Sequence, residues 1–210
     1  MKRILSILLA GAMALSLTAC GGTADPVETI PTGESETTQA PVQGDTSSGD
    51  SRALVVYFSA TGNTRGVAET LAEMQGADLF EIVPEEPYTD EDLDYSNETC
   101  RANQEQNDDS ARPAMASTLE NLDQYDVVYL GFPIWWGTLP KILYTFLETY
   151  DLAGKTVAPF CTSGGSGIGS AVEVIAQLAP EVTLTQGLRT TPDSAEADLT
   201  AWLQDIGLEH

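Results

Sequence analysis

The chain has 210 residues and a formal net charge of −23, from 32 acidic and 9 basic side chains. This length is enough for one well-buried domain, with residues left over. A surface with so many carboxylates repels polyanions, so the composition argues strongly against nucleic acid as a partner. We interpret the negative charge mainly as a source of solubility, and a surface for a basic redox partner is the alternative.

The first 19 residues have the pattern of an export signal. A short basic start (residues 1–3) precedes an almost wholly apolar run (residues 4–17), and residues 17–20 read LTAC. The apolar run has about 14 residues, whereas a membrane-spanning helix needs about 20. LTAC resembles the lipobox of bacterial lipoproteins, in which cleavage falls before a cysteine that then carries lipid.

We therefore expect residues 1–19 to be a lipoprotein signal peptide and Cys20 to be lipidated. The mature protein would be exported and held at the extracytoplasmic face of the bacterial cell membrane by the lipid alone. An ordinary signal peptide is the alternative. The rest of the segment 20–51 is rich in Thr, Ser, Gly, Pro, Asp and Glu and has hardly any aliphatic residues, so we expect a disordered tether.

Cysteine and histidine usage limits the metal chemistry. Lipidation of Cys20 would leave Cys100 and Cys161, either as free thiols or as one disulfide. Their spacing fits no metal-binding motif, and the only histidine is the last residue of the chain. We therefore expect no His/Cys metal site.

Residues 52–210 alternate between strand and helix patterns. We expect strands at 53–58, 79–83, 126–132, 156–161 and 182–185, and helices at 63–75, 140–150, 168–178 and 195–206. The strand runs lack polar alternation, which is typical of a sheet covered on both faces. The predicted class is α/β, with a doubly wound, five-stranded parallel sheet in three α/β/α layers.

A polar, acidic stretch at about 84–119 interrupts this alternation. It is too long for an ordinary connection and too poor in aliphatic residues for a core of its own, so we interpret it as an insertion. Long loops at the carboxyl end of a sheet often cover a ligand, and a surface excursion is the equal alternative. The stretch also contains two tyrosines and two arginines that solubility alone would not require: Tyr88, Tyr95, Arg101 and Arg112.

The loop after the first predicted strand has the composition of a phosphate cradle. Ser59, Thr61 and Thr64 offer hydroxyl donors, Gly62 permits close backbone approach, and Asn63 begins a helix whose first N–H groups favour an anion. The loop has no lysine of the kind that nucleotide triphosphates require. Helix capping by Thr61 or Asn63 is the alternative function.

The loop after the third predicted strand contains two adjacent tryptophans. Pro133, Ile134, Trp135, Trp136 and Gly137 follow the strand directly. Neighbouring side chains point in different directions, so we expect one indole in the core and at least one at the ligand crevice. An indole there would suit an aromatic ligand.

The loop after the fourth predicted strand is rich in glycine. It begins with Thr162, Ser163, Gly164 and Gly165, whose exposed backbone groups can hydrogen-bond the edge of a flat heterocycle. A flexible turn is the alternative. Because carboxyl ends of parallel strands meet at one edge of a sheet, we expect the three loops to converge on one crevice.

With these three loops in order, residues 52–210 resemble the flavodoxin family, as found in flavodoxin-like domains of bacterial exported lipoproteins. SATGNT resembles the phosphate loop of the family, YDVVYLGFPIWWGTLP its third strand and flavin-flanking loop, and TSGGSG its next flavin-edge loop. The resemblance implies bound FMN. The phosphate would lie on the loop 59–64, the flavin ring along residues 133–137, and its polar edge near residues 162–165.

The family resemblance implies electron transfer, with a redox partner protein or a quinone-like acceptor and without a catalytic side chain. Electron-transfer flavodoxins commonly cover the outer flavin face with a tyrosine from the loop after the fourth strand, which this chain lacks. Tyr95 or Arg101 of the insertion is the candidate substitute. Two other functions remain open: a flavin-dependent reductase of quinones or similar small molecules, and a non-redox module that binds a phosphorylated ligand.

Overall fold

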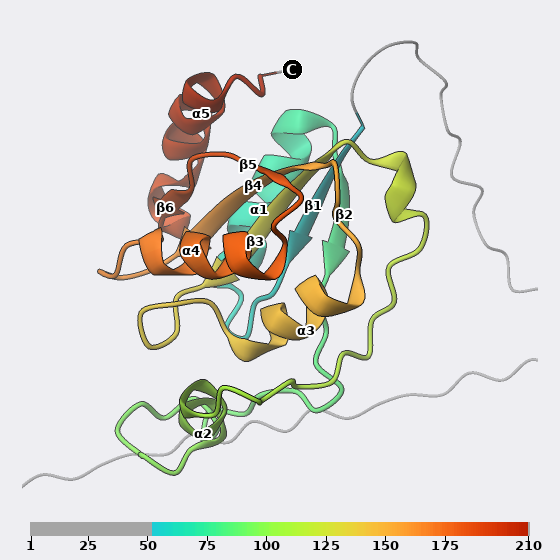
Figure 1. Cartoon of the computed structure of the whole chain (residues 1–210). Helices are drawn as coiled ribbons and strands as arrows, with labels where there is room; N and C mark the ends of the chain where they lie inside the picture. The colour runs from blue at the N-terminus through green and yellow to red at the C-terminus, as the bar shows by residue number, and fades with distance from the viewer. Residues whose placement is uncertain (1–51, 210) are drawn as a thin grey trace, which may run out of the picture. The chain divides into compact units, whose positions relative to one another are not determined.

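A computed structural model describes residues 52–209, in which a parallel sheet lies between two pairs of helices (Figure 1). The strand order is β2-β1-β3-β4-β5, and β6 also pairs with β4. The strands are β1 (Ala53–Tyr57), β2 (Asp78–Glu81), β3 (Val127–Pro133), β4 (Thr156–Thr162), β5 (Thr183–Leu184) and β6 (Leu188–Thr190). The α-helices are α1 (Asn63–Gln75), α2 (Arg101–Asn107), α3 (Lys141–Thr149), α4 (Gly169–Leu178) and α5 (Ala195–Ile206). The predicted signal peptide, Cys20 and the tether lie outside the described residues.

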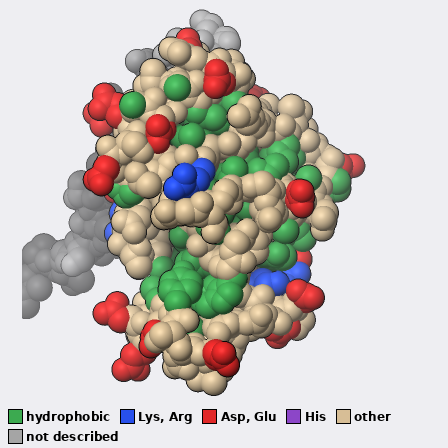
Figure 2. Space-filling model, turned by 90° about the vertical axis from the view of Figure 1, so that its left-hand side faces the viewer, with side chains coloured by type: hydrophobic (Ala, Val, Ile, Leu, Met, Phe, Trp, Pro, Cys, Tyr) green, Lys and Arg blue, Asp and Glu red, His purple; other side chains and the backbone are tan. Residues whose placement is uncertain are grey.

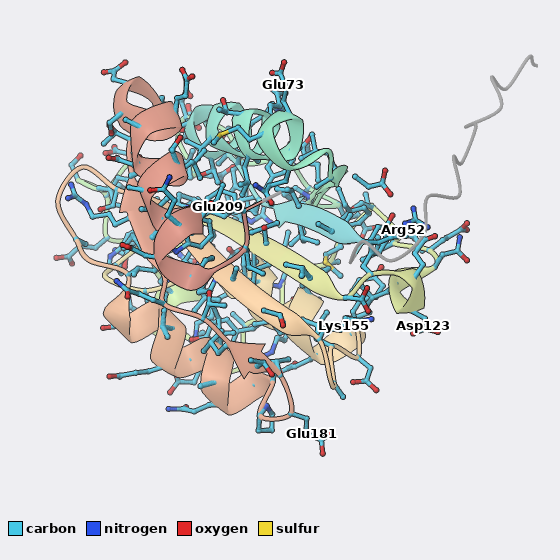
Figure 3. The ribbon with its side chains drawn as sticks, turned by 90° about the horizontal axis from the view of Figure 1, so that it is seen from above. Arg52, Glu73, Asp123, Lys155, Glu181 and Glu209 are labelled. Atoms are coloured by element: carbon cyan, nitrogen blue, oxygen red, sulfur yellow. The ribbon has the colours of Figure 1, made fainter. Side chains whose placement is uncertain are left out.

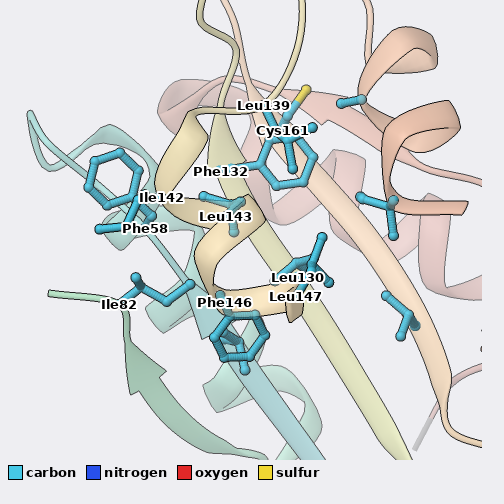
Figure 4. Packing of buried hydrophobic residues seen from close by; sticks show 14 of the residues in the cluster. Phe58, Ile82, Leu130, Phe132, Leu139, Ile142, Leu143, Phe146, Leu147 and Cys161 are labelled. Carbon is cyan, nitrogen blue, oxygen red and sulfur yellow. The ribbon is translucent and has the colours of Figure 1, made fainter. Parts of the chain in front are cut away.

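The sheet is apolar on both faces because each face is covered by helices. Every residue of β1 is buried, and successive side chains enter opposite layers. Leu54 and Val56 belong to the core under α3 and α4, where Phe132 and Phe146 also pack (Figure 4). Val55 belongs to the core under α1 and α5. The predicted α/β class and the three-layer architecture are confirmed.

The register of the strands brings three loops together at the carboxyl edge of the sheet. Tyr57 of β1 pairs with Gly131 of β3, which pairs with Phe160 of β4. The loop after β3 is also joined to the end of β4, since the backbone N–H of Ile134 donates to the carbonyl of Thr162 at 3.1 Å. The predicted convergence of the loops is therefore present.

The fifth strand position differs from the prediction. The sequence predicts a single strand at 182–185, but the edge is divided into β5 and β6, which both pair with β4. Gly187 lies between them, and a Cβ atom there would be 3.0 Å from the Cδ1 atom of Ile168. Close packing against the segment leading into α4 thus accompanies the break between the two strands. The prediction missed β6 because a three-residue strand is too short to show a hydrophobic period.

The predicted insertion is an ordered part of the domain. The insertion contains α2. The short 3₁₀ helix η1 (Leu122–Gln124) comes after the insertion. Its two ends are joined by an antiparallel bridge between Pro84 and Met115. Arg112 forms a bidentate ion pair with Glu148 of α3, with both N–O distances at 2.7 Å. In Figure 1 the segment lies beyond the carboxyl ends of the strands, below α3.

The opposite, amino edge of the sheet carries charged side chains of both signs (Figure 3). Arg52 forms an ion pair with Asp78 at 3.2 Å and donates a hydrogen bond to Gln124. Lys155 donates to the carbonyl of Tyr125 at 2.7 Å. These contacts join the start of β1 to β2, and the starts of β1 and β4 to the segment that leads into β3, at the edge remote from the convergent loops.

Both cysteines of the described chain are buried free thiols. Cys161 is fully buried on β4, and burial raises the pKa of its thiol to about 12. Cys100 lies at the N-terminus of α2, where its sulfur accepts a hydrogen bond from the backbone N–H of Asn103. The structure thus favours the free-thiol alternative over the disulfide. Among residues 52–209, no helix combines the length and apolar character of a membrane span.

Candidate functional site

A cavity of about 480 Å³ opens where the three loops meet. This volume lies within the range of about 300–1,000 Å³ that is typical of small-molecule sites. Its lining comes from the ends of β1, β3, β4 and β6 and from the insertion: Ser59, Ala60, Thr61, Asn63, Thr64, Leu93, Tyr95, Pro133, Ile134, Trp135, Thr162, Ser163, Gly164, Thr191 and Pro192.

The lining contains no charged side chain among the described residues. Polar groups in the cavity wall are hydroxyls, one amide and backbone groups, and the remaining wall is apolar or aromatic. An anionic group would therefore be held by neutral donors and by the dipole of α1. This donor set suits a monophosphate that is only held, whereas transfer of a triphosphate's terminal group requires a compensating cation.

The start of α1 is open toward a ligand. Gly62 precedes the helix in the left-handed region, with φ at 86°, and no side chain caps the helix. The first-turn N–H groups consequently have no partner within the helix. The side-chain amide of Asn63 donates to the hydroxyl of Thr61 at 3.2 Å, which leaves the Thr61 proton free to donate. Neither Thr61 nor Asn63 caps α1 with its side chain, so the alternative function of helix capping is not present.

Thr64 joins the first loop to the end of β4. Its side chain is almost fully buried, and its hydroxyl lies 2.8 Å from the hydroxyl of Thr162. One of these two hydroxyls must donate to the other, so one proton remains for another acceptor. This pair fixes the distance between two walls of the cavity.

The two tryptophans have different environments. Trp135 is 4% exposed, lines the cavity, and packs edge-on against Phe58 and Tyr88, with ring centroids 5.5 and 5.0 Å away. Trp136 is 38% exposed and lies outside the cavity lining. One indole is in the core and the other is exposed, as predicted, but the buried Trp135 is the one that lines the cavity.

A tight turn presents Trp136. Trp135 and Thr138 exchange two backbone hydrogen bonds of 2.9 and 3.0 Å, and Trp136 and Gly137 between them both have positive φ, at 46° and 82°. Such a turn normally has Asn or Gly at its first central position. A bulky residue in the left-handed region costs on the order of 1–2 kcal/mol, so the surrounding contacts hold the indole in a strained position.

The insertion supplies another wall of the cavity through Leu93 and Tyr95. The ring of Tyr95 lies against Trp136, with centroids 4.7 Å apart and an interplanar angle of 32°. Tyr95 is 59% exposed, so it stands at the cavity mouth rather than in the core. Of the two candidate substitutes for a ring-covering tyrosine, Tyr95 is the one at the cavity.

Arg101 has a different place, inside the insertion. Its guanidinium stacks on the ring of Tyr88 at 4.1 Å and pairs with Glu105 at 2.7 Å. The hydroxyl of Tyr88 donates to the same carboxylate at 2.5 Å, and burial together with this contact raises the pKa of Tyr88. The side-chain amide of Gln106 donates to the carbonyl of Trp135. The bond from Gln106 and the packing of Tyr88 on Trp135 dock the insertion on the tryptophan loop.

The glycine-rich loop is held by β6. The guanidinium of Arg189 donates to the carbonyl of Ser163 at 3.1 Å, and the backbone N–H of Ser163 donates to the carbonyl of Thr190. The chain then continues into Thr191 and Pro192, which line the cavity. The hydroxyls of Thr190 and Ser194 donate to Asp198, and these bonds lower the pKa of that carboxyl.

Most of the predicted site residues line the cavity, but Gly62, Trp136, Gly137 and Gly165 do not. Those four lie in the turns that carry the lining residues. Sequence reasoning assigned no role to Ala60, Leu93, Thr191 and Pro192. Thr191 and Pro192 follow β6, the short strand that the sequence analysis does not predict. The proline is the sequence signal that indicates a loop at this point.

The comparisons with known proteins agree with this geometry. The family model for flavodoxin matches residues 52–206. A candidate flavoprotein from Bacteroides eggerthii DSM 20697 is 45% identical, with a TM-score of 0.69, and the match covers 76% of this chain and 100% of that one. A second, from Bacteroides uniformis ATCC 8492, is 40% identical, with a TM-score of 0.70 and coverages of 73% and 98%.

A flavoprotein from Lactobacillus acidophilus NCFM, solved in complex with FMN, is 24% identical, with a TM-score of 0.58, and the match covers 73% of this chain and 99% of that one. At this identity the likeness concerns the fold. No curated protein matches the chain. The family model spans most of the chain and both Bacteroides proteins are well above 30% identity, so the chain belongs to the flavodoxin family.

Proposed function

We propose that the protein is an FMN-binding flavoprotein that transfers electrons. The observation that carries the proposal is the cavity at the carboxyl edge of the sheet, which has neutral walls and opens on the uncapped start of α1. Family membership supports it, as does the Lactobacillus relative that was solved with FMN.

The residues in the cavity fit the parts of FMN. Ser59, Thr61 and Thr64 offer hydroxyls, with the first N–H groups of α1, to hold the phosphate. Trp135 supplies a buried aromatic wall for the flavin ring, and the loop that begins at Ser163 supplies backbone groups for its polar atoms. When bound, FMN supplies the redox chemistry, while the chain holds it, orients it and excludes water.

The visible absorption spectrum of the chain from Arg52 onward tests the proposal. This part contains both cores, and it corresponds to the whole of the Bacteroides eggerthii relative. We expect a yellow protein that binds one FMN and that is bleached by dithionite and restored by air. A colourless protein that takes up no added FMN would contradict the proposal and favour a non-redox binding module.

A flavin-dependent reductase is the second candidate, and the exposure of Tyr95 and Trp136 at the cavity mouth favours it, because a small acceptor could approach there. Steady-state turnover with a pyridine nucleotide and a quinone separates the two functions. We expect slow turnover by the purified carrier alone. Fast turnover would show that the protein is an enzyme.

We further propose that the protein is a lipoprotein anchored at the extracytoplasmic membrane surface, on the basis of the LTAC motif at residues 17–20. In a bacterial host, the wild-type chain should incorporate radiolabelled palmitate and sediment with membranes. Cys20→Ser should do neither, while a serine at the buried Cys161 should leave labelling unchanged. Equal labelling of the wild type and Cys20→Ser would exclude lipidation at Cys20.

A further inference from the structure

Arg189 of β6 differs from most cations of the described chain because it has no carboxylate partner. It forms no ion pair with an acid of residues 52–209, and its guanidinium instead donates to the carbonyl of Ser163 at 3.1 Å. The cations that do form ion pairs are Arg52, Arg65, Arg101, Arg112 and Lys141. In a chain with 32 acidic side chains, a guanidinium directed at a loop carbonyl requires an explanation.

The hydrogen bond from Arg189 acts on one peptide group of the glycine-rich loop. The N–H of Ser163 donates to the carbonyl of Thr190 at 3.3 Å, and the hydroxyl of Ser163 accepts from the N–H of Gly165 at 3.2 Å. The peptide group between Ser163 and Gly164 is planar, and in its trans form the N–H of Gly164 points away from the carbonyl. By holding the carbonyl, Arg189 therefore fixes the direction of that N–H.

Gly164 offers this N–H to the cavity. It lines the cavity, and its N–H has no backbone acceptor among residues 52–209. Its φ lies outside the left-handed region, and a Cβ atom at this position would have no atom within 4 Å. Neither the backbone conformation nor packing within the protein therefore requires a glycine here. The missing side chain leaves the N–H accessible to a ligand that approaches closely.

The surroundings of Arg189 keep its guanidinium on the loop. Hydrogen bonds from Thr190 and Ser194, and then the charge of Arg189, lower the pKa of Asp198. That carboxylate already accepts the two hydroxyls and forms no ion pair with the guanidinium. In Figure 1 the loop between β4 and α4 projects on the left-hand side. Figure 2 views that side, where a basic side chain lies near the centre among uncharged polar side chains and backbone.

We propose that Arg189 is a positioning residue, which holds the Ser163–Gly164 peptide so that the N–H of Gly164 donates to an acceptor atom of the bound ligand. The inference rests on the proposed function, in which the ligand is FMN and the acceptor belongs to the polar edge of its ring. Arg189 lies outside the cavity lining, so it acts through the loop. A donor that is already aimed loses little free energy to ordering when the ligand binds. Because reduction adds negative charge to the ring, the same N–H should stabilise the reduced form more than the oxidised form.

Backbone order in the ligand-free chain from Arg52 onward tests whether Arg189 fixes the peptide. The proton–nitrogen heteronuclear NOE of Gly164 should show an ordered amide in the wild type and a disordered one in Arg189→Met. Arg189→Lys keeps a cation and a donor, and it should retain most of the order. Equal order at Gly164 in the wild type and Arg189→Met would overturn the proposal, whether or not the chain binds FMN.

Lys155→Met is the matched control for these measurements. It also removes a cation that donates to a backbone carbonyl, but at the amino edge of the sheet, remote from the cavity. The order of Gly164 and the affinity for FMN should both stay at the wild-type values. Equal effects of Lys155→Met and Arg189→Met would show that loss of any cation is sufficient, which would contradict a role for the contact with Ser163.

Flavin titrations measure the consequence for the ligand. Arg189→Met should lose about tenfold in affinity for FMN and for riboflavin alike, the size of one hydrogen bond to the ring that both ligands share. The loss should persist at about 1 M salt, where the Debye length is about 3 Å and an exposed charge is screened. A loss that is confined to FMN, or that disappears in salt, would mean that Arg189 attracts the phosphate by its charge, and the proposal would fail.

Spectroscopy and potentiometry report on the N–H itself. FMN should shift the amide proton of Gly164 downfield in the wild type but not in Arg189→Met, and no shift in the wild type would overturn the proposal. Arg189→Met should weaken binding of reduced FMN about tenfold more than binding of oxidised FMN, which lowers the two-electron potential by about 30 mV. If the wild type takes up no FMN, the proposed function fails, and the order of Gly164 still decides whether Arg189 fixes the peptide.

Discussion

Replacing Gly131 with alanine is expected to destabilise the domain by about 1–3 kcal/mol, the usual cost of overfilling a packed core. Gly131 lies on β3 beside Phe160 of β4, and a Cβ atom at this position would lie 2.2 Å from the Cζ atom of that ring. The ring is fully buried and packs against Trp202, so it cannot move aside without disturbing its neighbours. Urea unfolding followed by circular dichroism measures the loss.

A double-mutant cycle identifies the clash as the cause. Phe160→Leu shortens the side chain where the new Cβ atom would lie, so the double variant should lose less stability than the sum of the two single variants, by about 1 kcal/mol or more. Gly66→Ala is the control. No atom lies within 4 Å of a Cβ at Gly66, and this helix position should gain about 0.5–1 kcal/mol. Additive losses at positions 131 and 160 would show that the clash is not the cause.

Removing two hydroxyls from the loop after β1 should weaken FMN binding strongly. Ser59→Ala and Thr61→Val each delete one neutral donor from the cavity wall. A hydrogen bond to a charged group contributes about 1.5–3 kcal/mol, so each variant should lose about 10–100-fold in FMN affinity. Titration of the ligand-free chain with FMN, followed by flavin fluorescence, gives the dissociation constants.

Riboflavin provides the decisive comparison because it has the same ring without the phosphate. If the loop holds the phosphate, the two variants should bind riboflavin as the wild type does, since riboflavin has no phosphate for the deleted hydroxyls to hold. Thr200→Val removes an exposed hydroxyl that bonds within α5, and it should change neither affinity. Equal losses for FMN and riboflavin would mean that the loop does not hold the phosphate.

The sequence was sufficient for the central sheet because its strands are long and buried on both faces. The runs at β1, β3 and β4 have no polar alternation, and the predicted helices at 63–75 and 195–206 have the bounds of α1 and α5. Both helices end at a glycine in the left-handed region, which is a recognisable stop signal. Regular period and glycine punctuation together made these elements predictable.

The candidate site was predictable where it depends on topology alone. Loops that follow neighbouring parallel strands must meet at one edge, which brought Thr61, Trp135 and Ser163 to one cavity. The contribution of the insertion was not predictable in the same way. Its position depends on single contacts, such as Tyr88 on Trp135 and Gln106 on Trp135, which leave no periodic signal in a polar sequence.

The division of the last sheet position into β5 and β6 has a consequence for self-association. Exposed edge strands are templates on which other chains can add a strand, and proteins limit this hazard by keeping such edges short or broken. One edge of this sheet is the four-residue β2, and the other is interrupted at Gly187 between strands of two and three residues. Neither edge offers a long straight ladder, so the fold discourages edge-to-edge aggregation even when copies of the domain are crowded together.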